Sequence, residues 1–265
     1  MSTFARELYL LFIGNHIRII ISLVKMLLLN LLRLTLVAAL AFLFTIPTLQ
    51  AQETLSKTDG VRTLYLIRHG QYDHDDDRDP DIGKALVPLG IAQSRLVANR
   101  LKSLPVKINS LISSTMTRAR QTAMIINQDF PELELQQTRL IRECTPPTWR
   151  EDIMEGEDPE EIQKCTDNLD TAFSKYFIPS PDEEDRNDII VCHGNVIRYF
   201  VTKVLKVESM SWLQMTMGNC GLTVVRIKPD GSMKLISFND MGHIPPNMRT
   251  VLGFESKSKE LVLPE

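Results

Sequence analysis

The sequence predicts an α/β fold in which a mostly parallel sheet is the middle of three layers and helices cover both of its faces. Short apolar runs alternate with helical stripes across residues 61–248, a pattern typical of such sheets. Two of these runs end in a His-Gly pair, at His69 and His193. The turn signal Asp230-Gly231 separates the last two runs and predicts a hairpin at an antiparallel edge.

The first half of this region contains two strands, each followed by a helix. Residues 63–68 form the first strand, and an acidic loop, 73–81, follows it. Pro88 opens a helix in "VPLGIAQSRLVANRLKSL", because proline is tolerated in the first helical turn. The segment "INSLISSTM" is a short strand. The next helix is "MTRARQTAMIINQ", with Ser and Thr residues at its start as potential caps.

The second half begins with an irregular, acidic stretch at 142–162. The segment "LDTAFSKYF" is then predicted to form a helix, and residues 188–193 are predicted to form a central strand. The segment "NVIRYFVTKVL" is predicted to form a helix directly after His193. Strands at 221–227 and 233–239 flank the hairpin turn. About 190 residues are enough for one domain with an ample core.

The amino terminus has a different composition from the rest. Glu7 is the only acidic residue among the first 50, and residues 34–46 carry no charge. We interpret residues 1–51 as a signal peptide or a membrane anchor, and a buried core helix is the third reading. Residues 52–60 are a polar linker, 61–248 the folded domain, and 249–265 a carboxyl-terminal tail.

Several classes of function lack support in the sequence. The net charge of −3 gives no reason to expect nucleic acid as a partner. The motifs G-x-G-x-x-G, G-x-x-x-x-G-K-[ST] and G-x-S-x-G are absent. The acidic loop is not an EF-hand calcium site, because Arg78 and Lys84 occupy the positions where that motif requires Gly and Glu. We therefore interpret it as a solvated loop. The four cysteines contain no C-x-x-C pair, and a disulfide between Cys144 and Cys165 is left open.

Arg68, His69, Arg118 and His193 lie at three junctions between a strand and a helix. In open α/β sheets, ligands bind at this carboxyl edge. Two guanidinium groups hold a phosphoryl group through charge-assisted hydrogen bonds, and an imidazole with a pKa of about 6.5 is a competent nucleophile. Each residue alone also fits a plain strand end or helix surface. Together they predict phosphoryl transfer without a metal ion or cofactor.

The blocks "LIRHG", "SSTMTRARQTA" and "VCHGN" occur in this order and resemble the histidine phosphatase superfamily, in its phosphoglycerate-mutase-like branch. The similarity covers nearly all of 61–248, which is then a histidine phosphatase domain with a phosphoglycerate-mutase-like fold. "CHGNVIRYFV", "KPDGS" and "GHIPP" are similar to the family's mitochondrial serine/threonine protein phosphatases, which also begin with a membrane-spanning segment.

The resemblance implies a role for each site residue. His69 is the nucleophile that becomes phosphorylated, and Arg68, Arg118 and His193 line the phosphate pocket. The proton donor of the family lies on the loop after the third strand, where "LIRECTPP" offers Glu143; Glu151 and Glu155 are the alternatives. A mutase would show Glu-Ser after Arg-His-Gly, whereas this chain has Gln71-Tyr72.

We therefore expect a metal-independent phosphatase that hydrolyses phosphomonoesters through a phosphohistidine intermediate, with serine/threonine phosphoproteins as substrates. The alternatives are an exported small-molecule phosphomonoesterase or mutase, and a non-catalytic phosphate-binding scaffold. The amino-terminal segment would engage a membrane or the export machinery. The domain would then lie in the periplasm or at the inner membrane of a bacterium, or at a mitochondrial membrane of a eukaryote. A homo-oligomer is left open.

Overall fold

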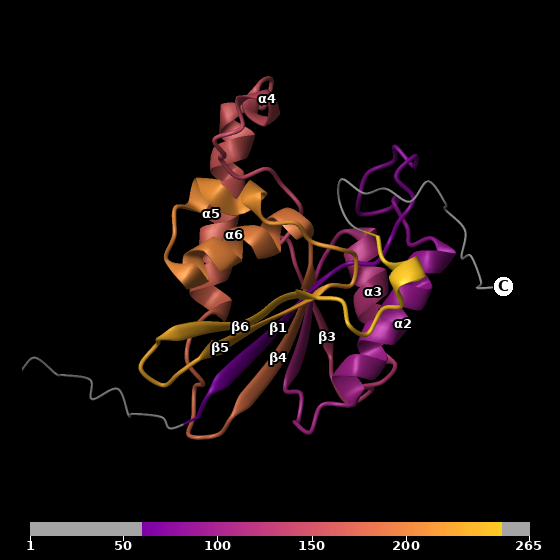
Figure 1. Cartoon of the computed structure of the whole chain (residues 1–265), viewed down its shortest axis with the longest axis vertical. Helices are drawn as coiled ribbons and strands as arrows, with labels where there is room; N and C mark the ends of the chain where they lie inside the picture. Colours follow the sequence, from indigo (N-terminus) through magenta and orange to yellow (C-terminus); the bar gives the residue numbers. More distant parts are fainter. Residues whose placement is uncertain (1–59, 251–265) are drawn as a thin grey trace, which may run out of the picture. The chain divides into compact units, whose positions relative to one another are not determined.

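The computed structural model describes residues 60–250. A six-stranded sheet has the order β3-β2-β4-β1-β5-β6 (Figure 1). The four parallel strands are β1 (Arg62–Arg68), β2 (Ser110–Ser114), β3 (Leu135–Thr138) and β4 (Arg186–Cys192). The antiparallel edge is formed by β5 (Leu222–Ile227) and β6 (Met233–Asp240), as the hairpin signal predicted. The signal peptide or anchor and nearly all of the linker and tail lie outside the described residues.

Helices cover both faces of this sheet (Figure 1), which confirms the predicted three-layer α/β fold. One face carries α2 (Pro88–Lys102) and α3 (Thr117–Asn127), and the other carries α5 (Pro159–Tyr176) and α6 (Gly194–Leu205). The short elements are α4 (Glu151–Met154), η1 (Ser209–Gln214) and η2 (Pro246–Met248). Within residues 60–250, no helix is both long and apolar enough to cross a bilayer.

The side chains of the central strands alternate between the two faces of the sheet, and this alternation divides the hydrophobic core into two clusters. Leu64 and Leu66 of β1 belong to the core under α5 and α6, whereas Tyr65 and Ile67 belong to the core under α2 and α3. Successive strand side chains point to opposite faces, so an apolar run in a central strand supplies both layers. Burial of each large apolar side chain stabilises the fold by roughly 1.5–3 kcal/mol.

The structure differs from the sequence prediction in the stretch before β4. Helix α5 begins at Pro159, ten residues before the predicted "LDTAFSKYF". Asp158 caps it by accepting from the backbone N–H of Glu160, and Pro159 follows as the first helical residue, a clear start signal. Strand β3 was missed because "LQQT" is polar and partly exposed at the sheet edge. Helix α3 begins after Met116 without a side-chain cap.

The last described residue packs against the domain. Thr250 is buried, and its hydroxyl donates to the side-chain oxygen of Asn219 at 2.8 Å. The side-chain amide of Gln93, on α2, donates to the same hydroxyl at 3.0 Å. The chain is therefore still held against α2 at residue 250.

Strand register brings the functional residues to one edge. Arg68 pairs with Cys192, and Ser113 pairs with Val191. His69 and His193, which follow the first of these pairs, and Ser114, the last residue of β2, consequently lie together at the carboxyl ends of three adjacent strands. This is the edge at which open α/β sheets bind their ligands.

A buried ion cluster lies at the opposite end of the same strands. Asp188 is fully buried and accepts hydrogen bonds from the Nε atoms of Arg62 at 2.7 Å and Arg186 at 3.0 Å, and from the hydroxyl of Ser110 at 2.6 Å. Removing one member of such a cluster leaves an uncompensated charge in the interior.

We expect Asp188→Ala to lower the free energy of unfolding by about 3–5 kcal/mol, because buried Arg62 loses its counter-charge. Urea titration followed by circular dichroism measures the change. Asp152→Ala is the matched control, since it removes an exposed partner of Arg150 and should leave the urea midpoint unchanged. Equal midpoints for the two variants would contradict the assigned role of Asp188.

Candidate active site

His69 is held in place by its backbone. It follows β1 directly, and its side chain is buried. Its backbone N–H donates to the carbonyl of Cys192 at 3.0 Å, and its own carbonyl accepts from Nδ2 of Asn219 at 2.9 Å. These bonds join the ends of β1 and β4 to the segment that precedes β5. They fix the backbone that carries the imidazole.

Hydrogen bonds define the tautomer of the His69 ring. Nδ1 lies 2.8 Å from the carbonyl oxygen of Gly70, which can only accept, so Nδ1 carries the hydrogen. Nε2 accepts from Nε of Arg118 at 3.1 Å. Burial, followed by Arg118, His193 and Arg68, holds the pKa of His69 well below its ordinary value. The ring is therefore neutral, with a lone pair on Nε2, as a nucleophile requires.

Three donors around this ring have no partner. Within residues 60–250, five buried side-chain polar atoms lack a hydrogen bond, and three of them are Nε of Arg68, Nη1 of Arg118 and Nδ1 of His193. Buried polar atoms are normally satisfied. Two of these three atoms are guanidinium donors, and Nδ1 of His193 is a third donor in the tautomer whose Nε2 accepts from Ser114. Unpaired donors concentrated at one place fit an anion with several acceptor oxygens.

Other contacts orient these donors. Nη1 of Arg68 donates to the carbonyl of Met217 at 2.6 Å. Nε2 of His193 lies 2.8 Å from the hydroxyl of Ser114, and the His193 ring centroid is 5.1 Å from that of His69. Burial, followed by the guanidinium groups of Arg118 and Arg68, lowers the pKa of His193 well below its ordinary value.

Glu143 reaches the same site from the loop after β3. One carboxylate oxygen accepts from the backbone N–H of Asn195, in the first turn of α6, at 3.2 Å. Ligand atoms of Glu143, His69 and His193 all lie within 4.8 Å of one another. Burial raises the pKa of Glu143, against the opposing effect of Arg118 and Arg68. The alternatives Glu151 and Glu155 are exposed, on α4 and just beyond it.

The trio of Glu143, His69 and His193 is also a possible metal-ligand set by distance. Its surroundings favour an anion instead. Arg118 already donates to Nε2 of His69, and the Arg68 side chain contributes to the lowered pKa of both histidines. A divalent cation at this position would be repelled by two buried guanidinium groups.

Sequence reasoning missed three residues that support the site. The ring of Tyr72 lies under the guanidinium of Arg118, at 4.6 Å, and edge-on to His69, at 5.2 Å. Ser114 and Asn219 fix the His193 ring and the His69 carbonyl. Ser114 was within reach of the strand-end argument, since it is the last residue of β2. Nothing in the sequence pattern distinguishes Tyr72 or Asn219.

Gly70, directly after His69, is required by close packing. It does not have a positive φ, but a Cβ there would come within 2.5 Å of the carbonyl oxygen of Gly90 on α2. The acidic loop 73–81 is solvated, as predicted, because none of its residues is buried, and Asp81 at its end pairs with Arg139 and Arg142.

Comparison with known proteins agrees with this geometry. The model of the histidine phosphatase superfamily, branch 1, matches residues 64–185 and 149–241, which together cover more than half of the chain. The chain belongs to the histidine phosphatase superfamily. It is a hydrolase that acts on phosphomonoesters.

Curated relatives of this histidine phosphatase share about a third of its residues. The mitochondrial serine/threonine-protein phosphatase Pgam5 of Caenorhabditis elegans is 37% identical over 201 residues, which are 72% of this chain and 67% of the relative. The human protein of the same name is 35% identical over 198 residues, covering 73% of this chain and 68% of the relative.

Solved structures support the fold of this histidine phosphatase. A phosphoglycerate mutase from Bacillus anthracis matches with a TM-score of 0.54 and 17% identity, over 71% of this chain and 97% of that one. A phosphoserine phosphatase from Entamoeba histolytica matches with a TM-score of 0.52 and 23% identity, over 69% of this chain and 100% of that one. The predicted phosphoglycerate-mutase-like fold is confirmed.

We expect a chelator to leave the turnover of this histidine phosphatase unchanged, because guanidinium groups supply the positive charge that a metal ion would otherwise provide. Phosphate release measured with and without excess EDTA checks this. A rate that collapses in EDTA and recovers with Mg²⁺ or Mn²⁺ would instead assign a metal to Glu143, His69 and His193.

Proposed function

We propose that the enzyme removes phosphate from phosphoserine and phosphothreonine in proteins through a phosphohistidine on His69. One observation carries the mechanism: a neutral imidazole faces three unpartnered donors, on Arg68, Arg118 and His193. The substrate class is supported by the names of the relatives and by an acid of raised pKa, which an alkoxide leaving group needs.

In the first step, the phosphate oxygens accept from Arg68, Arg118 and His193. Arg118 gives up its hydrogen bond to His69, which frees the lone pair on Nε2. This nitrogen attacks phosphorus, and the bond from phosphorus to the serine or threonine oxygen breaks. The proton of the Glu143 carboxyl moves to that oxygen, so the product leaves as a neutral alcohol.

In the second step, a water molecule enters where the alcohol has left. The Glu143 carboxylate accepts a proton from the water as its oxygen attacks phosphorus. The bond from phosphorus to Nε2 breaks, inorganic phosphate leaves, and both His69 and Glu143 return to their starting protonation states. The guanidinium groups stabilise the charge on the phosphoryl oxygens in both steps.

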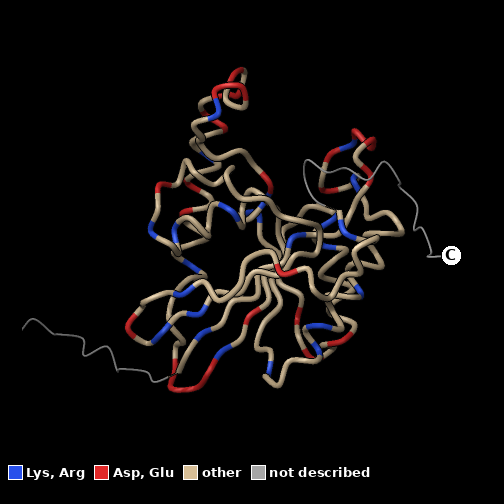
Figure 2. The backbone as a smooth tube through the Cα atoms, viewed as in Figure 1, with Lys and Arg blue, Asp and Glu red and all other residues tan. Residues whose placement is uncertain are grey.

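Acidic segments border the site on two sides. Figure 2 shows acidic residues gathered on the loop around 75–81 and on α4, which both project on the side of the strand carboxyl ends. Although Asp76, Asp81 and Asp152 are paired with arginine, the excess of carboxylates on these segments would attract Lys or Arg next to the phosphorylated residue and repel highly anionic small molecules. Phosphosites with basic neighbours are therefore the proposed substrates.

A substrate panel tests this function. Phosphoserine and phosphothreonine peptides with basic, neutral and acidic neighbours would be compared with sugar phosphates and phosphoglycerates by kcat/KM. We expect the basic phosphopeptides to rank first, and the advantage over acidic ones to shrink as salt rises. Faster hydrolysis of a sugar phosphate, or interconversion of phosphoglycerates, would contradict the proposal.

We also propose that residues 1–51 attach the enzyme to a membrane, with 52–60 as a linker, 61–248 as the histidine phosphatase domain and 249–265 as a tail. The mitochondrial names of the relatives favour a mitochondrial membrane over bacterial export. The disulfide in the domain is typical of an oxidising compartment and therefore favours the side away from the cytosol.

Fractionation of a eukaryotic host checks this location. We expect the full chain to sediment with mitochondrial membranes and to resist extraction by carbonate, whereas a chain starting at Gln52 should remain in the cytosol and retain activity toward 4-nitrophenyl phosphate. Full-length protein in the cytosolic supernatant would contradict the anchoring role of the amino-terminal segment.

A further inference from the structure

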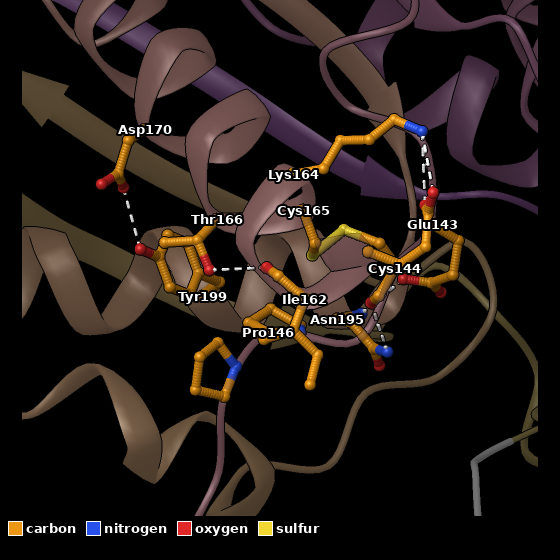
Figure 3. The surroundings of a disulfide bond; sticks show 12 residues. Glu143, Cys144, Pro146, Ile162, Lys164, Cys165, Thr166, Asp170, Asn195 and Tyr199 are labelled. Carbon is orange, nitrogen blue, oxygen red and sulfur yellow. Dashed lines mark hydrogen bonds and ion pairs between the residues drawn. A yellow bond between two sulfur atoms is a disulfide. The ribbon is translucent and has the colours of Figure 1, made fainter. Parts of the chain in front are cut away.

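The disulfide between Cys144 and Cys165 lies directly beside the proposed proton donor (Figure 3). Cys144 follows Glu143 in the chain, and Cys165 lies on α5. The two residues are 21 positions apart, and their Cα atoms are 5.8 Å apart. The bond therefore fixes the loop that carries the acid to the helix layer on one face of the sheet.

Helix α5 is a firm anchor for this loop. Cys165 is buried in the same core cluster as Leu169 of its own helix. Asp170 accepts from the hydroxyl of Tyr199 at 2.8 Å and pairs with Lys203 at 2.6 Å. Both partners are on α6, which begins directly after His193, so the disulfide joins the acid to the layer that also positions the phosphate pocket.

The other contacts of Glu143 hold it less tightly. Its backbone N–H points at Sδ of Met116 at 3.4 Å, and a thioether is a weak acceptor. Its carboxylate accepts from the N–H of Asn195 over 3.2 Å. The side chain of Asn195 donates to the carbonyl of Cys144 at 2.9 Å. The position of the acid thus depends on the backbone of Cys144, which the disulfide holds covalently and Asn195 holds through one hydrogen bond.

The rest of the loop has attachments of its own. Nε1 of Trp212 donates to the carbonyl of Pro147 at 3.0 Å. On the other side of Glu143, Arg142 pairs with Asp81 and donates to the hydroxyl of Thr115 at 3.0 Å. Loss of the disulfide should therefore shift the acid without unfolding the loop or disturbing His69.

Both cysteines of the disulfide line a cavity. This cavity has a volume of about 300 Å³ and is also lined by Glu143, Arg139, Arg142 and Lys164. A small thiol fits a cavity of this size. Cys192 and Cys220 are different, because both are fully buried.

We propose that the Cys144–Cys165 disulfide is the positioning element of the proton donor, and that its reduction selectively slows the hydrolysis of esters with poor leaving groups. The proposal rests on the proposed role of Glu143. A thiolate attacks one sulfur of the bond and forms a mixed disulfide, and a second thiol displaces it. Two electrons and two protons pass to Cys144 and Cys165, and the small thiol is oxidised to its own disulfide.

The selectivity follows from the geometry of proton transfer. A general acid must lie within about 2.6–3.2 Å of the oxygen that it protonates. A displacement of about 1 Å at a reacting group can cost about 10²-fold in rate. The hydrolysis rate of an ester with an alkoxide leaving group should show this loss in full. The rate for a nitrophenyl ester should not change, because nitrophenolate leaves without protonation.

The experiment uses the full chain in detergent, oxidised or reduced with dithiothreitol, and two substrates, a phosphoserine peptide and 4-nitrophenyl phosphate. Thiol titration confirms the redox state. We expect reduction to lower kcat for the peptide by about tenfold or more, part of the 10²–10⁴-fold worth of a general acid. The rate for the aryl ester should change by less than about twofold, since its leaving group needs little protonation.

Two variants isolate the disulfide. Cys144→Ser with Cys165→Ser should reproduce the reduced enzyme and no longer respond to dithiothreitol, which removes Cys192 and Cys220 as the source of the effect. Glu143→Gln should slow the peptide selectively, and reduction should then add nothing, because the acid is already absent.

The outcomes separate the inference from the proposed function. If Glu143→Gln is selective but reduction leaves the ratio of the two rates unchanged, the positioning role is wrong and the function stands. If reduction slows both substrates equally with loss of circular dichroism signal, the disulfide is only structural, and the inference fails. If Glu143→Gln slows both substrates equally, the role of Glu143 is wrong, and the inference falls with it.

Discussion

Replacement of His69 by alanine should lower turnover by about 10⁴-fold or more, because the nucleophile that forms the covalent intermediate is lost. The lone pair on Nε2 faces the donors of the phosphate pocket, where the proposed role of His193 is to donate to the phosphate through Nδ1, since its Nε2 is engaged by Ser114. Phosphate release from phosphopeptides at saturating substrate measures the loss.

The intermediate itself can be trapped. Wild-type enzyme quenched rapidly in alkali should carry one phosphohistidine, stable in base and labile in acid, and mass spectrometry should locate it at His69. The alanine variant should lack it, yet keep its far-ultraviolet circular dichroism and its binding of inorganic phosphate, because Arg68 and Arg118 remain. Full activity in this variant would end the proposed mechanism.

Replacement of Glu143 by glutamine should slow phosphoserine and phosphothreonine peptides by about 10²–10⁴-fold, the usual worth of general acid catalysis. Glutamine keeps the size of the side chain but has no proton to give. The effect on 4-nitrophenyl phosphate should be much smaller, because its leaving group is a weak base. Steady-state kcat values for the two substrates check this.

The pH profile gives a second readout of the same residue. Glu143 donates only when protonated, and burial raises its pKa, so the peptide rate should fall as pH rises through that raised pKa. His69 attacks only when neutral, and its pKa is lowered, so the acid limb should lie below pH 6.5. Glu143→Gln should remove the alkaline limb and keep the acid one. Glu151→Gln, on exposed α4, is the matched control and should behave as wild type.

Much of the site was predictable because it depends on strand ends. Apolar runs that stop at Arg68-His69 and at His193 predict that these residues lie at a shared edge of the sheet. The parallel pairing of β1 with β4 confirms that they do. Arg118 followed from its place at the start of a helix. Glu143, by contrast, came from a family resemblance, because its loop has no regular pattern. Its closeness to His69 and His193 and its contact with Asn195 separate it from the exposed Glu151 and Glu155.

The sequence by itself determined the layers of this protein and the position of its catalytic edge. These features follow from local periodicity and from short motifs, each contained in at most about 18 consecutive residues. Only the tertiary structure decided the tautomer of His69, the unpaired donors around it, the support from Tyr72 and Ser114, and the disulfide beside Glu143. The physical reason is distance along the chain: Arg118 meets His69 from 49 residues away, and Ser114 meets His193 from 79. Contacts of this kind exist only after both cores have packed and the strand register has been fixed.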